Sequence, residues 1–484
     1  MNEKINLMTT NDGLEGFEVY TRSRIAQDNS EWMMVRKGSE RFLAARGDGR
    51  DGLQGEDAGA FKICPLTIEN SLALRQKLPH LNPSPISTDV ISIGMGDRLG
   101  RATVGHLAAI DGTGAMPVLA QQSVRELNLT NRNFPSVLAD AVWGVFQYGY
   151  TGAFGADGDH LKTRDALEDA IAAGYKMITL DCSEQIRNEI YSLSAADRFE
   201  RYNKLPEADK SYYRKRYLEQ AQSFGAVDEE TLLESVLVYA DAIRFARDIY
   251  EEYLADRPDI SFEVSIDETD CATTLFAHAF VATELIERYK VKVISMAPRF
   301  VGEFQKGIDY IGDLEEFDEQ LLGHQAIAQQ WGYKISFHSG SDKFAVFPSA
   351  ARITGQRYHL KTAGTSWLEF VRQLSHDHTE LFHELYNFSL ENLENAKKNY
   401  HVNVTVDTCP SIDILKPGDY WKLLEDDNAR QLLHINYGGI LNFEENGELV
   451  LKKRLYNILD NEEEAYHQII RTHFQRHLKS LGLI

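Results

Sequence analysis

The amino-acid sequence predicts an α/β protein built on a (β/α)8 barrel of the TIM type, with an extra N-terminal layer and a helical insertion. Three observations support this fold class. Short apolar runs typical of buried strands alternate with helical stretches along most of the 484 residues. Polar side chains suited to chemistry follow several of these runs, as expected at the carboxyl ends of barrel strands. One long charged stretch without strand signals interrupts the series.

Nine segments have the composition of strands. They are residues 90–94, 117–121, 152–156, 177–181, 261–267, 291–296, 334–338, 358–361 and 402–406. A (β/α)8 barrel needs eight strands, so we expect one of the nine to be misassigned or to lie outside the barrel.

The remaining segments complete the predicted domain layout. Residues 1–85 contain the hairpin-like EWMMVRKGSERFLAARG and form the added layer. Residues 86–435 form the catalytic barrel, with a helical insertion at about 184–257. Residues 436–484 form a hairpin and an amphipathic helix that carries His467, His473 and His477. The spacing of these histidines favours a solvated face or a subunit contact over a metal site.

Composition excludes several classes of function. The formal net charge of -22 argues against nucleic acid as a partner, because such binding needs a basic face. The four cysteines, Cys64, Cys182, Cys271 and Cys409, are far apart and indicate a reducing cytoplasm without disulfides. The sequence has no signal-like start and no bilayer-spanning apolar run. We therefore expect a soluble cytoplasmic protein with a small-molecule partner; assembly into a homo-oligomer stays open.

The run SFEVSIDET places two carboxylates inside the barrel. Strand alternation turns Glu263, Ser265 and Asp267 inward. Two inward carboxylates are costly unless they are paired or bound to metal. The alternative to a site role is an interior salt bridge with Lys334 or Lys361.

A second inward-facing set ends in a histidine. In KISFHSGSDK, alternation groups Lys334, Ser336 and His338, and His338 lies nearest the carboxyl end of the strand. The small-residue loop that follows, with Asp342 and Lys343, favours a ligand role for His338 over that of a hydrogen-bonded core histidine.

A third motif, FGADGDHLKT, sets Asp159 beside His160 in a Gly-rich turn where a strand should end. In an extended strand the two side chains would point to opposite faces, but the glycines at 155 and 158 allow a turn that aims both at one cavity. The alternative is an ordinary Asp-Gly-Asp turn. Histidines from different strand ends, completed by an oxygen ligand, suit a catalytic Zn, Mn, Co or Ni ion.

The loop GMGDRLGRAT follows a predicted strand but lacks the residues of a P-loop or a dinucleotide fingerprint. No nicotinamide cofactor is therefore expected. Asp97 and Arg98 of this loop face a ligand or belong to a structural turn.

Six motifs in this order resemble the tagaturonate epimerase family. They are ISIGMGDRLGRAT, FGADGDHLKT, EVSIDET, APRFVGEFQKGIDYIGD, FHSGSDKFAVFP and HLKTAGTSWLE, between about residues 85 and 410. The resemblance implies a metal-dependent barrel epimerase that interconverts D-tagaturonate and D-fructuronate in hexuronate catabolism. Relatives interconvert the neutral ketohexoses tagatose and fructose at carbon 4.

The resemblance also implies roles for individual residues. His160, Gln305 and His338 would hold the metal, and Asp159 and Glu263 would act as the acid/base pair. Apart from the resemblance, we expect Asp267 and Glu268 to act in support or as a lid contact. His324 is an alternative ligand. A uronate carboxylate needs a cation or a cluster of backbone donors, and Lys343 and Arg98, beside Asp342 and Asp97, are the basic residues nearest the motifs. Lys343 is preferred, because its loop follows directly from His338.

The expected reaction is a retro-aldol epimerisation, because the hydrogen on carbon 4 is not acidified by the ketone. A transient oxidation and reduction is the competing mechanism. A metal-dependent ketose aldolase or isomerase on the same barrel and a non-catalytic sugar-binding protein are the alternative functions.

Overall fold

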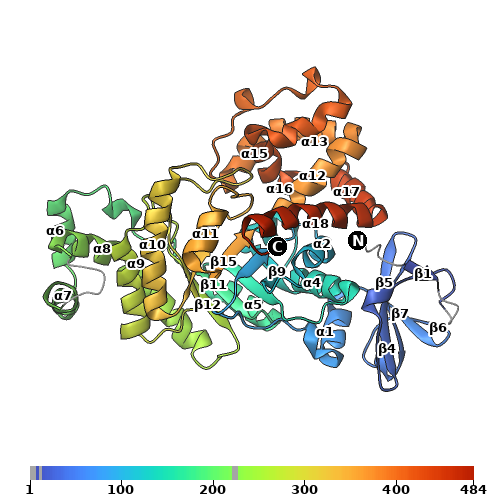
Figure 1. The fold of residues 1–484 in the computed structure, drawn as a ribbon, viewed down its shortest axis with the longest axis horizontal. Coiled ribbons are helices and arrows are strands. Elements are labelled where there is room, and N and C mark those ends of the chain that lie inside the picture. The colour runs from blue at the N-terminus through green and yellow to red at the C-terminus, as the bar shows by residue number, and fades with distance from the viewer. Residues whose placement is uncertain (1–6, 10–13, 221–226, 363) are drawn as a thin grey trace.

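A closed barrel of eight parallel strands forms the centre of the protein (Figure 1). The computed structural model describes residues 7–9, 14–220, 227–362 and 364–484. Each barrel strand pairs with the next in chain order, and the last pairs with the first. The strands are β8 Ser92–Met95, β9 Met116–Ser123, β10 Gly155–Leu161, β11 Met177–Asp181, β12 Ser261–Ser265, β13 Ser295–Ala297, β14 Lys334–Phe337 and β15 Tyr358–Thr362. The predicted (β/α)8 barrel is confirmed.

The prediction of a strand at 402–406 is wrong. Val402 and Val404 are buried while Asn403 and Thr405 are exposed, which explains the strand-like alternation. The segment has no strand partner in the described structure, because pairing of β15 with β8 closes the barrel and leaves no edge. The strand expected at 152–156 begins later than predicted, and the Gly-rich motif itself forms β10.

Helices surround the barrel (Figure 1). They are α1 Ile68–Lys77, α2 Thr103–Ile110, α3 Val124–Thr130, α4 Phe134–Tyr148, α5 Arg164–Ala173, α6 Ala195–Asn203, α7 Glu207–Arg214, α8 Glu229–Ile249, α9 Leu275–Ala282, α10 Leu314–Trp331, α11 Phe347–Thr354, α12 Thr365–Asp377, α13 Thr379–Glu391, α14 Leu393–Ala396 and α15 Asp427–Ile435. The predicted insertion between β11 and β12 consists of α6, α7 and α8, far from the N-terminal sheet in Figure 1. Among the described residues, every helix is too short or too polar to cross a lipid bilayer.

The N-terminal layer is an antiparallel sheet whose centre is the predicted hairpin. Its strands are β1 Leu7–Thr9, β2 Glu18–Tyr20, β3 Ile25–Gln27, β4 Ser30–Lys37, β5 Glu40–Gly47, β6 Glu56–Ala58 and β7 Phe61–Pro65. In β4, Met33 and Val35 pack in a small outer core, whereas Trp32 and Met34 join the main core of the protein. Strand alternation thus gives this sheet two buried faces.

The C-terminal segment differs from the prediction. In place of the expected hairpin, the chain forms α16 Tyr437–Leu441, α17 Val450–Asn461 and α18 Glu463–Ser480. Helix α18 packs on α2 and α12, and it buries His467, His473 and His477. The prediction of a solvated histidine face or subunit contact is therefore wrong, because this face of the helix is its inner one.

A buried carboxylate joins the two ends of the chain. Glu463, the first residue of α18, accepts hydrogen bonds from Tyr20 (2.6 Å), Arg41 (3.0 Å) and Gln147 (2.7 Å). Burial alone would raise the pKa of Glu463, but the charge of Arg41 and these hydrogen bonds lower it to about 2. The ionised form is therefore strongly favoured by folding.

We expect Glu463→Gln to destabilise the protein at pH 7 by up to about 3 kcal/mol, the equivalent of this lowering of the pKa. A lowered carboxyl pKa stabilises the fold above the unfolded pKa, and this contribution is lost as the pH falls towards 2. The stability difference between wild type and variant, measured by urea unfolding, should therefore shrink between about pH 4.5 and pH 2. The exposed neighbour Glu464 supplies the control variant Glu464→Gln. A difference that stays constant across this pH range would contradict the role of the Glu463 charge.

Candidate active site

A cavity of about 1140 Å³ opens where the barrel strands end. Its lining includes residues at or just beyond the carboxyl ends of seven strands: Ser123, His160, Asp181, Asp267, Pro298, His338 and Lys361. This is the end of a (β/α)8 barrel at which active sites are found. The structure therefore brings the predicted residues Asp159, His160, Gln305 and His338 to one cavity.

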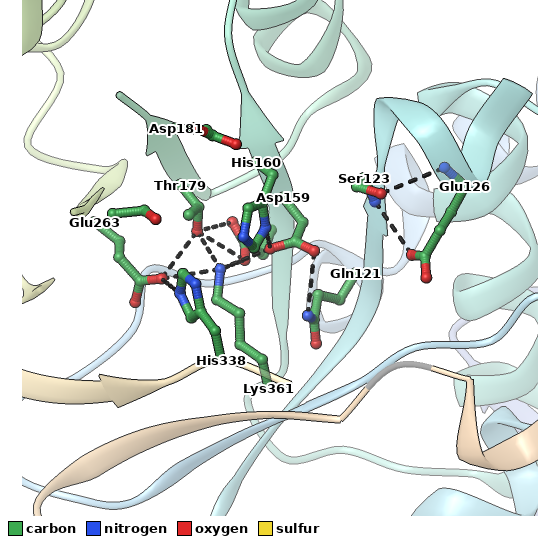
Figure 2. Close-up of polar contacts among 12 residues, drawn as sticks. Gln121, Ser123, Glu126, Asp159, His160, Thr179, Asp181, Glu263, His338 and Lys361 are labelled. Atoms are coloured by element: carbon green, nitrogen blue, oxygen red, sulfur yellow. Dashed lines mark hydrogen bonds and ion pairs between the residues drawn. The ribbon is translucent and has the colours of Figure 1, made fainter. Parts of the chain in front are cut away.

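The buried ammonium group of Lys361 organises the floor of this cavity (Figure 2). Its Nζ lies 2.9 Å from Asp157 Oδ2, 2.7 Å from Asp159 Oδ1 and 2.9 Å from Glu263 Oε1. Burial alone would lower the pKa of Lys361, but the three carboxylates raise it well above its usual value. The interior salt bridge considered for Glu263 is thus present with Lys361, whereas Lys334 binds the carbonyls of Ser87 and Val90 instead.

An irregularity in β10 turns Asp159 and His160 to the same cavity. The strand register shifts between Gly158 and Leu161, and His160 has a left-handed backbone with φ of 54°. A non-glycine residue rarely adopts this conformation, and such strain is concentrated at functional sites. Asp159 and His160 thus line one cavity, and the break occurs within a strand rather than in the expected turn.

Each cavity histidine is paired with its own carboxylate. His160 Nδ1 lies 2.9 Å from Asp159 Oδ1, and His338 Nε2 lies 2.9 Å from Glu263 Oε1. An ionised carboxylate only accepts hydrogen bonds, so both of these ring nitrogens carry a proton. The pairing leaves His160 Nε2 and His338 Nδ1 as the remaining nitrogens of two rings whose centroids are 4.6 Å apart.

Asp267 completes a set of three donors. Its Oδ2 lies 3.1 Å from His338 Nδ1, and His160, Asp267 and His338 each offer one atom within 4.8 Å of the others. Two imidazoles and one carboxylate, with each imidazole oriented by a further carboxylate, match the donor set of catalytic sites for borderline divalent ions. The residues present therefore fit a metal ion.

The ionisation of the site follows from these pairs. Burial alone would raise the pKa values of Asp159 and Glu263, but Lys361 and their histidines hold both well below the usual range. Burial raises the pKa of Asp157 to about 6, with neighbouring carboxylates adding to the effect of burial and Lys361 opposing it. Burial alone would lower the pKa of His338, but Asp267 and Glu263 raise it to about 10, so a metal ion at Nδ1 would bind in competition with a proton.

Gln305 and Glu263, two residues to which the resemblance assigns roles, are not part of this set of three metal-binding side chains. Gln305 lines the cavity, but its Oε1 accepts a hydrogen bond from Gln431 (2.7 Å). Contact between Gln305 and a metal stays a prediction. Glu263 is fully buried and contacts His338 instead of lining the cavity. Its acid/base role also stays a prediction.

Asp97 and Arg98 belong to a structural turn, the alternative that the sequence left open. Asp97 accepts hydrogen bonds from three backbone amides, those of Leu99, Gly100 and Ala102. Arg98 is fully buried, lies 2.9 Å from Glu126 and stacks on Tyr437. Neither residue is part of the described cavity lining.

Asp342 and Lys343 also lie outside the described lining and fix loops instead. Lys343 Nζ donates to the carbonyls of Gln305 (2.8 Å), Ile308 (2.5 Å) and Ser341 (3.1 Å). With these contacts, its ammonium group is not available in the cavity for a substrate carboxylate.

Asp342 contacts Arg430 (2.8 Å), His473 (2.9 Å) and His477 (3.5 Å). Asp342, His473 and His477 are a second group with metal-binding atoms, but the Asp342 amide already donates to His477 Nε2 (3.1 Å). His324, the alternative ligand, is also buried away from the cavity, with its Nδ1 2.8 Å from Nδ1 of His278.

Sequence reasoning overlooked two groups at the site. Asp157 shares inward parity with Asp159, so strand alternation along β10 could have revealed it. Lys306 lines the cavity, but its turn after β13 has no periodicity from which to infer its direction. Burial, together with nearby Arg125, lowers the pKa of Lys306 to about 8. This direction is expected for an ammonium group without a carboxylate partner.

Comparisons with known proteins agree over almost the full length. The sequence profile of the tagaturonate epimerase family matches residues 20–481. A tagaturonate/fructuronate epimerase from Thermotoga maritima is 38% identical over 476 residues, which cover 96% of this chain and 97% of that protein.

Two crystal structures of the fructuronate-tagaturonate epimerase from Cohnella laeviribosi share this fold. The native structure has a TM-score of 0.94 and 41% identity, and the match covers 97% of each chain. A complex with one glycerol has a TM-score of 0.93 and 41% identity over 96% of each chain. On this evidence the chain belongs to the tagaturonate epimerase family and is an enzyme of the isomerase class.

Proposed function

We propose that this protein is a metal-dependent epimerase that interconverts D-tagaturonate and D-fructuronate. Inversion occurs at carbon 4 through cleavage and re-formation of the bond between carbons 3 and 4. The observation that carries the proposal is the pairing of His160 with Asp159 and of His338 with Glu263 beside Asp267. This arrangement supports a metal ion at the place where a barrel enzyme binds its substrate.

His160, His338 and Asp267 would hold the ion, with Gln305 as a further oxygen ligand. A bound divalent ion would supply Lewis-acid stabilisation of the charge that develops on the ketone oxygen. Asp159 and Glu263 orient the two imidazoles through the hydrogen bonds described above, which fixes the nitrogens presented to the ion.

Asp159 is the cavity carboxylate placed to exchange the proton of the carbon-4 hydroxyl. It is held ionised by Lys361 and His160, as a base must be before the reaction. As that proton is removed, the bond between carbons 3 and 4 breaks, carbon 4 becomes an aldehyde, and the bonding electrons pass to the ketone-bearing fragment as an enediolate. After the aldehyde turns over, the bond re-forms on its other face and the proton returns to the new hydroxyl. Glu263, on the other side of Lys361 in Figure 2, is the second carboxylate of the proposed pair.

Product analysis tests this function. Protein supplied with divalent metal should convert tagaturonate to fructuronate and the reverse, with no accumulation of three-carbon fragments. Three-carbon products would identify an aldolase, and an aldose product would identify an isomerase. Either result would overturn the epimerase proposal.

Removal of the metal should abolish activity. The variants His160→Ala and His338→Ala should each lose the ion, because the two remaining protein ligands hold a borderline metal poorly. Metal content measured by elemental analysis is the readout, and dialysis against a chelator is the companion test. His324→Ala, at a buried histidine outside the donor set, is the control and should keep its metal. Full metal content and normal turnover in both ligand variants would disprove the site.

Asp159→Asn and Glu263→Gln should each lower kcat by at least ~100-fold, because amides cannot exchange the proton. Asp159→Asn should also weaken metal binding by roughly 10- to 100-fold, because Asp159 orients His160. Glu263→Gln should also weaken metal binding by roughly 10- to 100-fold, because it orients His338. Kinetics at saturating and limiting metal separate the two effects. If excess metal restores Glu263→Gln to wild-type turnover, Glu263 only positions His338, and the second carboxylate must be sought at Asp267 or Glu268.

Lys343→Met should lower the thermal midpoint and the turnover of acidic and neutral ketoses alike, because three loop carbonyls lose their common donor. Differential scanning calorimetry and kinetics with tagaturonate and tagatose test this expectation. A rise in KM confined to tagaturonate, at unchanged stability, would instead show that Lys343 binds the substrate carboxylate.

A further inference from the structure

The charges that line the cavity disfavour binding of an anion unless one cationic side chain contacts it directly. The lining of the cavity contains more carboxylates than Lys and Arg side chains, and the protein as a whole has a formal charge of -22. Long-range attraction therefore does not draw an acidic sugar into the site. A uronate needs a specific local donor, and the Lys and Arg side chains of the lining are the candidates.

All but one of these side chains have partners. Lys361 binds three carboxylates, and Lys162 donates to Ser183 and lies 3.5 Å from Asp181. Arg125 donates to the carbonyl of Asn399 and packs over Tyr400. Arg299 donates to the carbonyl of Thr269. Within the described part of the chain, the Lys306 ammonium group has no hydrogen-bond or ion-pair partner.

The backbone around Lys306 is held from both sides. Lys343 Nζ binds the carbonyls of Gln305 and Ile308, and Arg430 Nε donates to the carbonyl of Gly307 (2.7 Å). Gly307 has φ of 81°, a conformation that favours glycine and turns the chain directly after Lys306. A loop fixed in this way around one unpartnered side chain is preorganised for a ligand, since little ordering of the backbone remains on binding.

The position also suits the proposed reaction. In a hexuronate the carboxylate at carbon 6 is two bonds from carbon 4, so its binding group must lie near the reacting atoms. Lys306 and Asp159 line the same cavity. An ammonium group binds a carboxylate as a point charge with rotatable donors, unlike the rigid fork of arginine. It therefore keeps hold of the aldehyde fragment while the carbon-4 carbonyl turns over.

We propose that Lys306 binds the substrate carboxylate and determines the preference for keto-uronates over neutral ketohexoses. This inference rests on the proposed function. It moves the carboxylate subsite from Lys343, where the sequence suggested it, to the loop that Lys343 supports.

The test compares Lys306→Met with wild type on a charged and a neutral substrate. KM for tagaturonate should rise tenfold or more, the equivalent of ~1.4 kcal/mol, while KM for tagatose changes less than twofold. Lys162→Met is the matched control, because Lys162 lines the same cavity but is already paired. It should leave both KM values near those of wild type.

Competitive inhibition gives a second readout that does not depend on turnover of the neutral sugar. Wild type should bind D-gluconate more tightly than sorbitol, and Lys306→Met should reduce this preference at least tenfold. Equal losses of kcat on both substrates would assign Lys306 to proton transfer and overturn the inference, as would an unchanged inhibitor preference. Wild-type protein that epimerises neither uronate would instead refute the proposed function.

Discussion

The rest of the site depends on one constraint, the contact of three buried carboxylates with a single ammonium group. Asp157, Asp159 and Glu263 come from β10 and β12, and Lys361 comes from β15, across the barrel. Removing one member of such a network leaves an uncompensated charge in the interior, which is strongly destabilising. The same contacts keep Asp159 and Glu263 ionised, and each of them orients a histidine. Charge balance inside the barrel thus also determines which nitrogen atoms face the cavity.

The sequence predicted those parts of the protein that follow from local periodicity. Alternation along SFEVSIDET placed Glu263 inside the barrel, and the resemblance brought Asp159, His160 and His338 together. Periodicity failed at residues 402–406, where the burial pattern of an extended segment is the same with or without a strand partner. It failed again on α18, because an amphipathic helix does not reveal whether its histidine-bearing face is covered.

Residues with similar sequence signals have different tasks in the structure. Lys343 and Lys306 both lie in Gly- or Ser-containing loops after barrel strands, yet Lys343 has three carbonyl partners and Lys306 has no described one. Arg98 looked like a substrate contact but stacks under Tyr437 in the interior. The difference arises from segments distant in sequence, namely residues 305–308 for Lys343 and 434–437 for Arg98. No local pattern contains that information.

The position of α18 has a consequence for synthesis of the protein on the ribosome. The last long helix of the chain holds Asp342, in the loop that follows the ligand histidine of β14, and it also binds Tyr20 and Arg41 of the first sheet through Glu463. Domains generally begin to fold from the N-terminus while translation continues. Here the first sheet and the loop after β14 both depend on contacts with residues 463–480, which are synthesised much later than either segment. Folding of both segments during translation therefore stays incomplete until the residues of α18 have been synthesised.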